Sequence, residues 1–188
     1  MLKTEIEKAL DVLRNGGVIL YPTDTVWGLG CDATNEAAAA KINAIKGRSD
    51  DKSFIILLDT DAKVQSYVSE VPDVAYDLIE FAENPLTLIF SGAKNLAQNV
   101  INADGSVGIR VVKHEFCTPL LQRFRKPITS TSANISGQPA PKFFDEIDEN
   151  ILAAVDYVVD WEQELRTPRK PSTIMKLGAG GQFSFIRR

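Results

Sequence analysis

The sequence has very few of the residues that usually serve as metal ligands or nucleophiles. Its 188 residues include one histidine, His114, and two cysteines, Cys31 and Cys117, which are far apart and not in metal-ligand spacing. A zinc site built on several histidines is therefore excluded, and at most one Ser-His triad could form. We expect the two cysteines to be buried thiols, not a disulfide. We expect His114 to be a surface residue between a strand and a helix.

The sequence also lacks long apolar segments and several familiar motifs. No apolar run approaches the ~20 residues that a membrane helix needs. The N-terminal MLKTEIEKAL is charged, so we expect a cytoplasmic protein with no secretory signal and no membrane association. There is neither a Gly-x-Ser-x-Gly nucleophile elbow nor a P-loop. Any phosphate site must therefore be built in another way.

Charges of both signs are nearly balanced, with a net charge of −4 and a pI near 5.1. This balance argues against a dedicated nucleic-acid binder, whose surface is usually basic, but it does not exclude a local basic cleft. The positive charges do cluster, at 46–52, 166–170 and 187–188. The composition, 44% hydrophobic and 24% charged, is that of an ordinary globular domain.

Hydrophobic periodicity predicts that helices and strands alternate along the chain. The expected strands are 18–21, 53–59, 86–90, 106–112, 127–132, 157–160, 172–177 and 183–188, and the expected helices are 4–14, 35–46, 61–69, 72–83, 115–125 and 142–154. Helix pairs and a closing strand pair interrupt a simple parallel repeat. The pattern predicts a single α/β domain, residues 1–188, around a mixed twisted sheet flanked by helices.

The stretch GLGCDA (28–33) matches the Gly-x-Gly-x-x-Ala fingerprint of dinucleotide-binding proteins. However, six residues, PTDTVW, separate it from the preceding strand, whereas the fingerprint requires its glycines at the strand-to-helix turn. Asp59 also lies beyond the usual ~20-residue spacing of the ribose-binding carboxylate. An NAD enzyme is therefore the weaker interpretation.

Three other stretches carry polar side chains at expected element ends. YPTDTVWGLG (21–30) is either a proline-initiated turn or a small polar pocket roofed by an aromatic. KGRSDDK (46–52) is either solvated surface or a polyphosphate site in which an arginine fork takes part. In ITSTSANISG (128–137), the serines and asparagine either cap a turn or form a polar shelf, because alternation aims Ser130, Ser132 and Asn134 to one side.

Arg110 stands within the apolar strand GIRVV, so we expect it to be partly buried. A buried arginine is costly without an anionic partner. A structural carboxylate and a ligand anion are both open from this position alone.

Five blocks taken together, YPTDTVWGLG, KGRSDDK, the GIR strand, STSANISGQP and PSTIMKL, resemble the YrdC-type threonylcarbamoyl-AMP synthase family. They occur in the family's order over about residues 10 to 187, and the chain is similar to the single-domain form. The most specific signature is the pair Lys46-Gly-Arg48 and Ser132-Ala-Asn134.

The resemblance implies a YrdC-like fold with a concave basic cleft and a nucleotidyltransferase reaction. L-threonine, bicarbonate or CO2, and ATP would give threonylcarbamoyl-AMP and pyrophosphate, with Mg²⁺ assisting. The product would serve the tRNA t6A37 modification through a separate threonylcarbamoyl transferase system. No protein nucleophile or protein metal site is implied, which fits the shortage of such residues.

The resemblance also implies roles for individual residues. Those expected to bind threonine are Thr23, Thr25, Arg110, Ser130 and Ser172. Those expected to bind ATP are Lys46, Arg48, Lys52, Ser132, Asn134 and Arg187, with Lys46 and Arg48 acting in catalysis.

The chain departs from the family pattern at Ser49, Ser53, Val112 and Lys176, which puts the role of Lys52 in doubt. The main alternative function is a non-catalytic paralogue of the same fold that binds double-stranded RNA or tRNA.

Overall fold

The computed structural model describes residues 1–47, 54–178 and 182–187. Its α-helices are α1 (Leu2–Arg14), α2 (Glu36–Lys46), α3 (Asp73–Phe81), α4 (Cys117–Phe124) and α5 (Glu149–Ala154). Short 3₁₀ helices are η1 (Asp61–Ser66), η2 (Gln98–Val100) and η3 (Phe144–Glu146). The strands are β1 (Ile19–Tyr21), β2 (Gly28–Gly30), β3 (Ile55–Leu58), β4 (Leu86–Phe90), β5 (Val107–Val111), β6 (Ile128–Ser132), β7 (Tyr157–Val158), β8 (Thr173–Leu177) and β9 (Phe183–Arg187).

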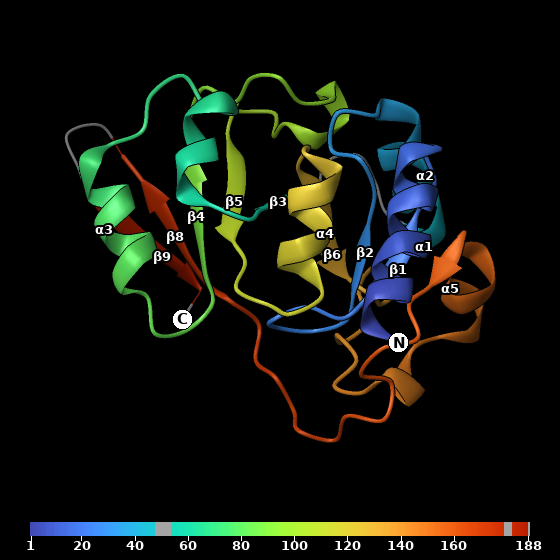
Figure 1. Ribbon diagram of the computed structural model, residues 1–188. Coiled ribbons are helices and arrows are strands. Elements are labelled where there is room, and N and C mark those ends of the chain that lie inside the picture. Colours follow the sequence, from blue (N-terminus) through green and yellow to red (C-terminus); the bar gives the residue numbers. More distant parts are fainter. Residues whose placement is uncertain (48–53, 179–181, 188) are drawn as a thin grey trace.

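These strands form one mixed sheet in the order β7-β1-β2-β6-β3-β5-β4-β8-β9 (Figure 1). Strands β1 and β7, β3 and β5, and β4 and β8 pair parallel, and the other neighbours pair antiparallel. Helices flank the sheet. The predicted α/β fold with a mixed sheet is therefore confirmed.

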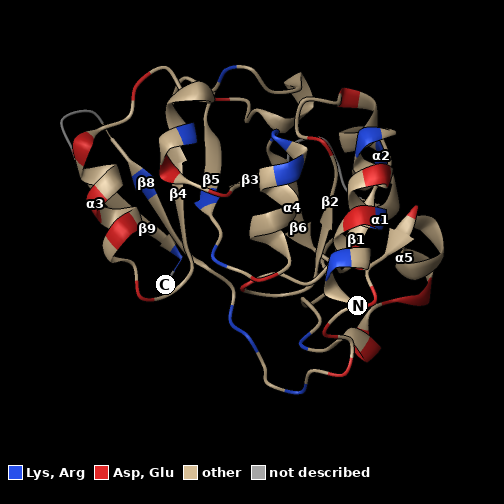
Figure 2. Ribbon diagram, in the orientation of Figure 1, with Lys and Arg blue, Asp and Glu red and all other residues tan. Residues whose placement is uncertain are grey.

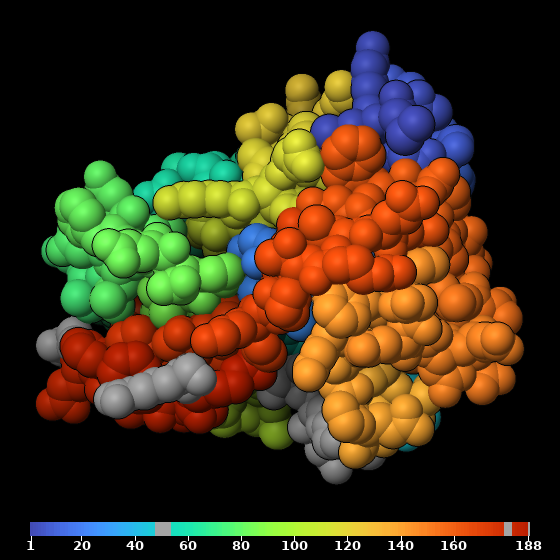
Figure 3. Space-filling model, turned by 90° about the horizontal axis from the view of Figure 1, so that it is seen from below, coloured from blue at the N-terminus to red at the C-terminus, as the bar shows by residue number. Residues whose placement is uncertain are grey.

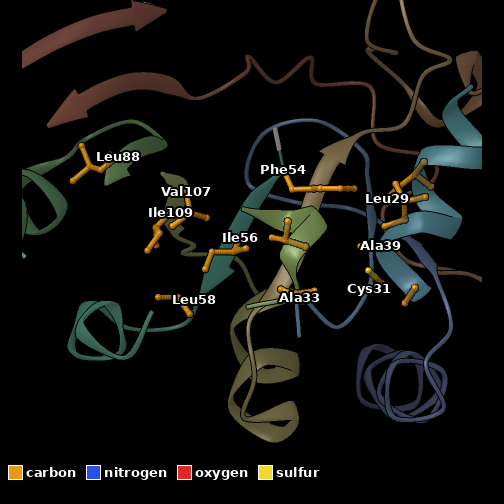
Figure 4. Packing of buried hydrophobic residues seen from close by; sticks show 14 of the residues in the cluster. Leu29, Cys31, Ala33, Ala39, Phe54, Ile56, Leu58, Leu88, Val107 and Ile109 are labelled. Atoms are coloured by element: carbon orange, nitrogen blue, oxygen red, sulfur yellow. The ribbon is translucent and has the colours of Figure 1, made fainter. Parts of the chain in front are cut away.

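Two apolar clusters hold the layers together. One packs side chains of α2 and α5, including Ile42 and Ile151, against the sheet, and Figure 4 shows part of it around Ile56 and Leu58. The other packs α1 and α4, including Leu13 and Leu120, against β1, β3 and β6. Because strand side chains alternate, the central strands contribute to both clusters, which explains the continuous apolar run predicted at 53–59.

Strand β2, whose residues are Gly-Leu-Gly, was not predicted from the sequence. It returns antiparallel to β1 after the loop 22–27, and Tyr21 pairs with Gly28. A β-carbon at Gly30 would lie 2.6 Å from the Tyr21 ring and 2.7 Å from the Thr129 carbonyl oxygen, so only glycine fits. The Gly-x-Gly motif thus lies inside a sheet and makes no phosphate-binding turn, and the dinucleotide interpretation loses its structural basis.

Two predicted helices are shorter or broken. The predicted helix 61–69 is the 3₁₀ helix η1, because Val68 forms a β-bridge with Ala93 and Ser69 donates its N–H to Gly92. The predicted helix 142–154 is divided into η3 and α5, because Asp148 caps a new helix by accepting from the Asn150 N–H. In both cases a specific local or tertiary hydrogen bond overrides the helical periodicity.

Cys31 and Cys117 are both buried free thiols, as predicted. Burial raises the pKa of Cys31 to about 12 and that of Cys117 well above its usual value, so both remain protonated near neutral pH. Within the described part of the chain, no helix has the length and apolar character to cross a membrane.

Candidate functional site

Strand register gathers several predicted site residues on one face of the sheet. Ser130 pairs with Ile55, Ile55 pairs with Gly108, and Gly108 pairs with Ile89. Paired residues point to the same face, as do residues two apart in one strand. Ser132 and Arg110 therefore join Ser130 on this face. Thr87 also lies on this face, because it is two residues from Ile89. Thr87 pairs with Ile174, and Ile174 pairs with Arg187, so Arg187 lies on the same face.

Arg110 lies at the centre of this face and is 4% exposed. Its Nη2 is 3.2 Å from Oδ1 of Asp24, and the two side chains form an ion pair. Neither of these atoms, nor Arg110 Nε, has a hydrogen-bond partner among the described residues. Arg110 is thus buried as predicted, and it has a carboxylate neighbour that only partly satisfies its donors.

Asp24 reaches Arg110 from the tip of a tight turn between β1 and β2. The hydroxyl of Thr23 accepts the Thr25 N–H at 3.1 Å and donates to the Val26 carbonyl at 2.8 Å. Its single proton is then used, so the Thr25 hydroxyl donates in their 3.0 Å contact and keeps its lone pairs for another donor. Trp27 is largely buried and packs on Phe144, and together with Thr23 and Thr25 it lines a cavity of about 20 Å³ beside the turn.

Ser172 lies directly before β8 and is 2% exposed. Its hydroxyl is 2.8 Å from that of Thr87, and its carbonyl accepts from Arg187 Nε at 3.1 Å and Nη2 at 2.9 Å. Burial and the nearby charge of Arg110 lower the pKa of Arg187. Two arginines close enough to repel each other are typical of a site that receives an anion.

The second predicted group forms where α2 ends. The Lys46 ammonium donates to the carbonyl of Ser132, and to that of Asn134 at 2.6 Å. The N–H of Ser136 donates to the Lys46 carbonyl at 2.8 Å. The two halves of the family signature, 86 and 88 residues apart, are therefore in direct contact.

Asn134 lies in a turn beyond β6, so it does not continue the strand alternation. Its amide nitrogen donates to the carbonyls of Ile135 and Gln138, at 2.9 and 2.8 Å. Its buried Oδ1 has no hydrogen-bond partner in the described part of the chain. The side chain thus braces the loop and leaves an acceptor facing inward. The predicted residues Arg48 and Lys52 lie outside the described residues, as do Ser49 and Ser53.

The connection between β7 and β8, residues 159–172, crosses the lower face of the molecule (Figures 1 and 3). Its Arg169 forms a two-point ion pair with Glu162, at 2.7 and 2.8 Å, and donates to the Thr23 carbonyl at 2.5 Å. His114 Nε2 is 3.3 Å from Glu162. This cluster fastens the connection to the turn that carries Asp24.

The interpretation of His114 as a surface residue was therefore wrong. Its side chain is only 6% exposed, because the β7–β8 connection covers it. Burial lowers the pKa of His114, although the carboxylate of Glu162 acts in the opposite direction. Asp24, Glu162 and Arg169 were also missed. Only the charge cluster at 166–170 gave any sign of Arg169.

Basic positions lie on β8, at the end of β9 and along the connection, and those of the connection lie toward the bottom of Figure 2. A cavity of about 150 Å³ opens beside the ion pair and is lined by Asp24, Val111, Lys113 and the segment 82–86. A larger cavity, of about 650 Å³, lies between α3 and β8 and contains none of the predicted site residues.

Comparisons with known proteins agree over almost the whole chain. The Sua5/YciO/YrdC family model, described as telomere recombination, matches residues 11–188. A protein of Pseudoalteromonas translucida (strain TAC 125) named threonylcarbamoyl-AMP synthase is 34% identical over 184 residues, which cover 96% of this chain and 97% of that protein.

Two solved structures have the same fold. P. abyssi Sua5, in complex with L-threonine, has a TM-score of 0.81 and 28% identity over 92% of this chain. The match covers 50% of that protein, so this chain corresponds to about half of Sua5. E. coli YciO has a TM-score of 0.85 and 25% identity, and the match covers 100% of this chain and 90% of YciO.

Proposed function

Because this chain belongs to the Sua5/YciO/YrdC family, we propose that it is an L-threonylcarbamoyladenylate synthase. It forms threonylcarbamoyl-AMP and pyrophosphate from L-threonine, bicarbonate or CO2, and ATP. The observation that carries this function is the buried pair of Arg110 and Asp24, whose opposite charges and unfilled hydrogen bonds suit a zwitterionic amino acid. The near full-length similarity to a protein named threonylcarbamoyl-AMP synthase supports threonine as this amino acid.

The reaction is a nucleotidyl transfer that needs no protein nucleophile. The amine of threonine captures CO2, and an oxygen of the resulting carbamate attacks the α-phosphorus of ATP while pyrophosphate leaves. The protein therefore acts by positioning the reactants and stabilising negative charge. This role fits a site of arginines, hydroxyl groups and one lysine.

Two groups of residues divide the substrates between them. Arg110 binds the threonine carboxylate, and the residues beside the amino acid are Thr23, Thr25, Ser130 and Ser172. Lys46 and Arg48 bind the triphosphate and act in catalysis. The other nucleotide-binding residues are Lys52, Ser132, Asn134 and Arg187.

ATP binds as its Mg²⁺ complex. No three His, Cys, Asp or Glu side chains meet in a metal-binding group within the described residues. Mg²⁺ commonly keeps its waters and is held by substrate phosphates, so a dedicated protein cage is not required. The substrate phosphates bring the ion, and Lys46 is one of the residues that bind these phosphates.

The product serves tRNA t6A37 modification, and a separate transferase system places the threonylcarbamoyl group on the adenosine. We place this activity in the cytoplasm, where tRNA and ATP are both available. The single domain 1–188 carries the synthase site on a concave, locally basic cleft over the sheet face.

The test is pyrophosphate release from ATP and Mg²⁺ by the purified protein. Release should require L-threonine and bicarbonate together, because a carbamate must form before anything attacks the α-phosphorus. Detection of threonylcarbamoyl-AMP by mass spectrometry should accompany it. Release without bicarbonate, or no release with threonine, would remove the synthase function. Salt-sensitive binding of double-stranded RNA or tRNA without turnover would then favour the non-catalytic alternative.

A further inference from the structure

Asp24 forms an ion pair with Arg110, but no individual contact with a substrate has been assigned to it above. It stands between Thr23 and Thr25 at the tip of a turn fixed by the Thr23 hydroxyl. Its side chain is 11% exposed, and its Oδ1 is fully covered and has no hydrogen-bond partner among the described residues. A buried hydrogen-bond acceptor without a donor costs free energy unless a ligand supplies the donor.

The pairing of Asp24 with Arg110 is incomplete in a specific way. Oδ1 and Nη2 are 3.2 Å apart, but their geometry makes no hydrogen bond, and Arg110 Nε is also unfilled. An α-amino acid carries a carboxylate and an ammonium group on one carbon. When an α-amino acid binds between the two side chains, its carboxylate can accept hydrogen bonds from Arg110. Its ammonium group can donate one to Asp24.

On the basis of the function proposed above, we propose that Asp24 binds the α-ammonium group of threonine. Asp24 also takes the proton whose loss starts the reaction. Arg110 holds the carboxylate of the same molecule. The Thr25 hydroxyl oxygen, on the same turn, keeps lone pairs that can accept from the ligand. Asp24 is then a catalytic residue, because it contacts the reacting nitrogen.

The step balances as follows. Asp24 Oδ1 takes one proton from the ammonium group, and the N–H bond that breaks leaves a lone pair on nitrogen. The lone pair attacks the carbon of CO2, so that an N–C bond forms while one C–O π bond opens onto oxygen. The nitrogen loses a second proton to water. The products are the carbamate, protonated Asp24 and a hydronium ion.

The surroundings of Asp24 suit a proton acceptor. Burial raises its pKa, while the charges of Arg110, His114 and Arg169 act in the opposite direction. A carboxylate with a raised pKa is a stronger base than an exposed one. The other titratable groups that face it are Tyr21 and Cys117, which burial keeps neutral, with Glu83 and Lys113 across the 150 Å³ cavity. That cavity borders Asp24 and is large enough to admit CO2 or bicarbonate.

The first experiment measures binding by calorimetry, with L-threonine and with 3-hydroxybutyrate, which is threonine without its amine. In Asp24→Asn, threonine affinity should fall about tenfold or more, because the charge-assisted hydrogen bond is lost. The affinity for 3-hydroxybutyrate should stay unchanged or rise, because Arg110 no longer has a competing carboxylate. Equal weakening of both ligands would show that Asp24 only positions Arg110. Unchanged threonine binding would show that Asp24 has no role in binding. Either result overturns the proposal.

The matched control is Asp145→Asn, which removes a carboxylate that is 62% exposed and paired with Arg166. It should change neither affinity. If Asp24→Asn fails to fold, the unmodified protein still provides a test. It should bind threonine about tenfold or more tightly than 3-hydroxybutyrate at pH 7, and equal affinities would overturn the proposal.

The second experiment is the pH dependence of kcat/KM for threonine. The deficit of Asp24→Asn should shrink as pH rises, because more free amine is then supplied by solution. A deficit that is constant over pH would show that Asp24 takes no proton, and would overturn the proposal. If the unmodified protein releases no pyrophosphate at all, the proposed function fails, but the binding comparison of the two ligands still tests Asp24.

Discussion

Among single residues, Arg110 provides the most direct test of the substrate assignment. Arg110→Lys keeps the positive charge beside Asp24 but loses the planar fork that can hold a carboxylate at two points. We expect KM for threonine to rise roughly 10- to 100-fold, the value of one lost charge-assisted hydrogen bond, while the protein remains folded. Steady-state kinetics with varied threonine and saturating ATP measure this change.

The control for this change is Arg123→Lys on α4. Arg123 is 42% exposed and its nearest carboxylate, on Glu7, is 3.7 Å away, so its replacement should leave KM unaltered. If Arg110→Lys unfolds the protein while its folded fraction binds threonine normally, Arg110 serves only the structural ion pair with Asp24.

The contrast between Arg110 and Asp24 shows what a sequence reveals about single residues. Arg110 could be predicted because a charge within an apolar strand is unusual and requires a partner. Asp24 could not, because an aspartate after Pro-Thr is an ordinary turn residue. Its importance depends on the register of β5, 86 residues later in the chain, which brings Arg110 to it. Local chemistry suggests which residues are functional, but tertiary contacts decide how they combine.

At the scale of elements, the β7–β8 connection depends on Arg169. Arg169→Lys cannot hold both Glu162 oxygens and the Thr23 carbonyl, because Lys presents one point charge. We expect amide hydrogen exchange in residues 160–172 to accelerate about tenfold or more, and global stability to change little, since the side chain of Arg169 is 29% exposed. Hydrogen exchange with mass spectrometry measures this directly.

Arg166→Lys is the matched control within the same connection. Its pairing with Asp145 is more than half exposed on both sides, at 56% and 62%, and should contribute little. If both variants exchange at the rate of the unmodified protein, Arg169 does not fasten the connection.

Elements differ in how well their sequences identify them. A strand with continuous apolar residues, such as β3, was predicted because burial on both faces leaves a clear pattern. Strand β2 was missed because Gly-Leu-Gly has no strand pattern, and the Tyr21 ring that requires a glycine at position 30 is not indicated by any local rule. The β7–β8 connection has no periodicity, so its position over the Asp24 turn could not be predicted.

For the whole molecule, the order of the strands follows from contacts between distant segments. Strand β7, near the end of the chain, pairs with β1 near its start, and β6 lies between β2 and β3. Periodicity predicted every strand except β2, and the mixed sheet, but it contains no information on which strands become neighbours. Buried polar contacts help to select this order, because they are satisfied in only one arrangement.

Glu5 makes the clearest of these contacts. On α1 it is 4% exposed, and it accepts from the Tyr157 hydroxyl and, at 2.8 Å, from the Asp160 N–H. Lys8 pairs with its other oxygen at 2.9 Å. The carboxylate thus ties the first helix to the edge strand β7. Burial by itself raises the pKa of Glu5, but these hydrogen bonds and the ion pair outweigh burial, and its pKa is lowered overall.

A lowered pKa in the folded state means that the stabilisation by Glu5 is present above the unfolded pKa of about 4.3 and is lost as pH falls through the folded value. Glu5→Gln should therefore lower the free energy of unfolding by about 1.5–3 kcal/mol at pH 7, and the deficit should shrink toward pH 3. Urea titrations at pH 7, 5, 4 and 3 measure this. Asp156, whose pKa is also lowered, retains its share of the acid sensitivity in the variant.

Glu7→Gln, on the same helix but 54% exposed, is the control and should have little effect at any pH. A deficit of equal size for the two variants, or one that does not shrink below pH 5, would show that Glu5 does not stabilise this arrangement through its charged form.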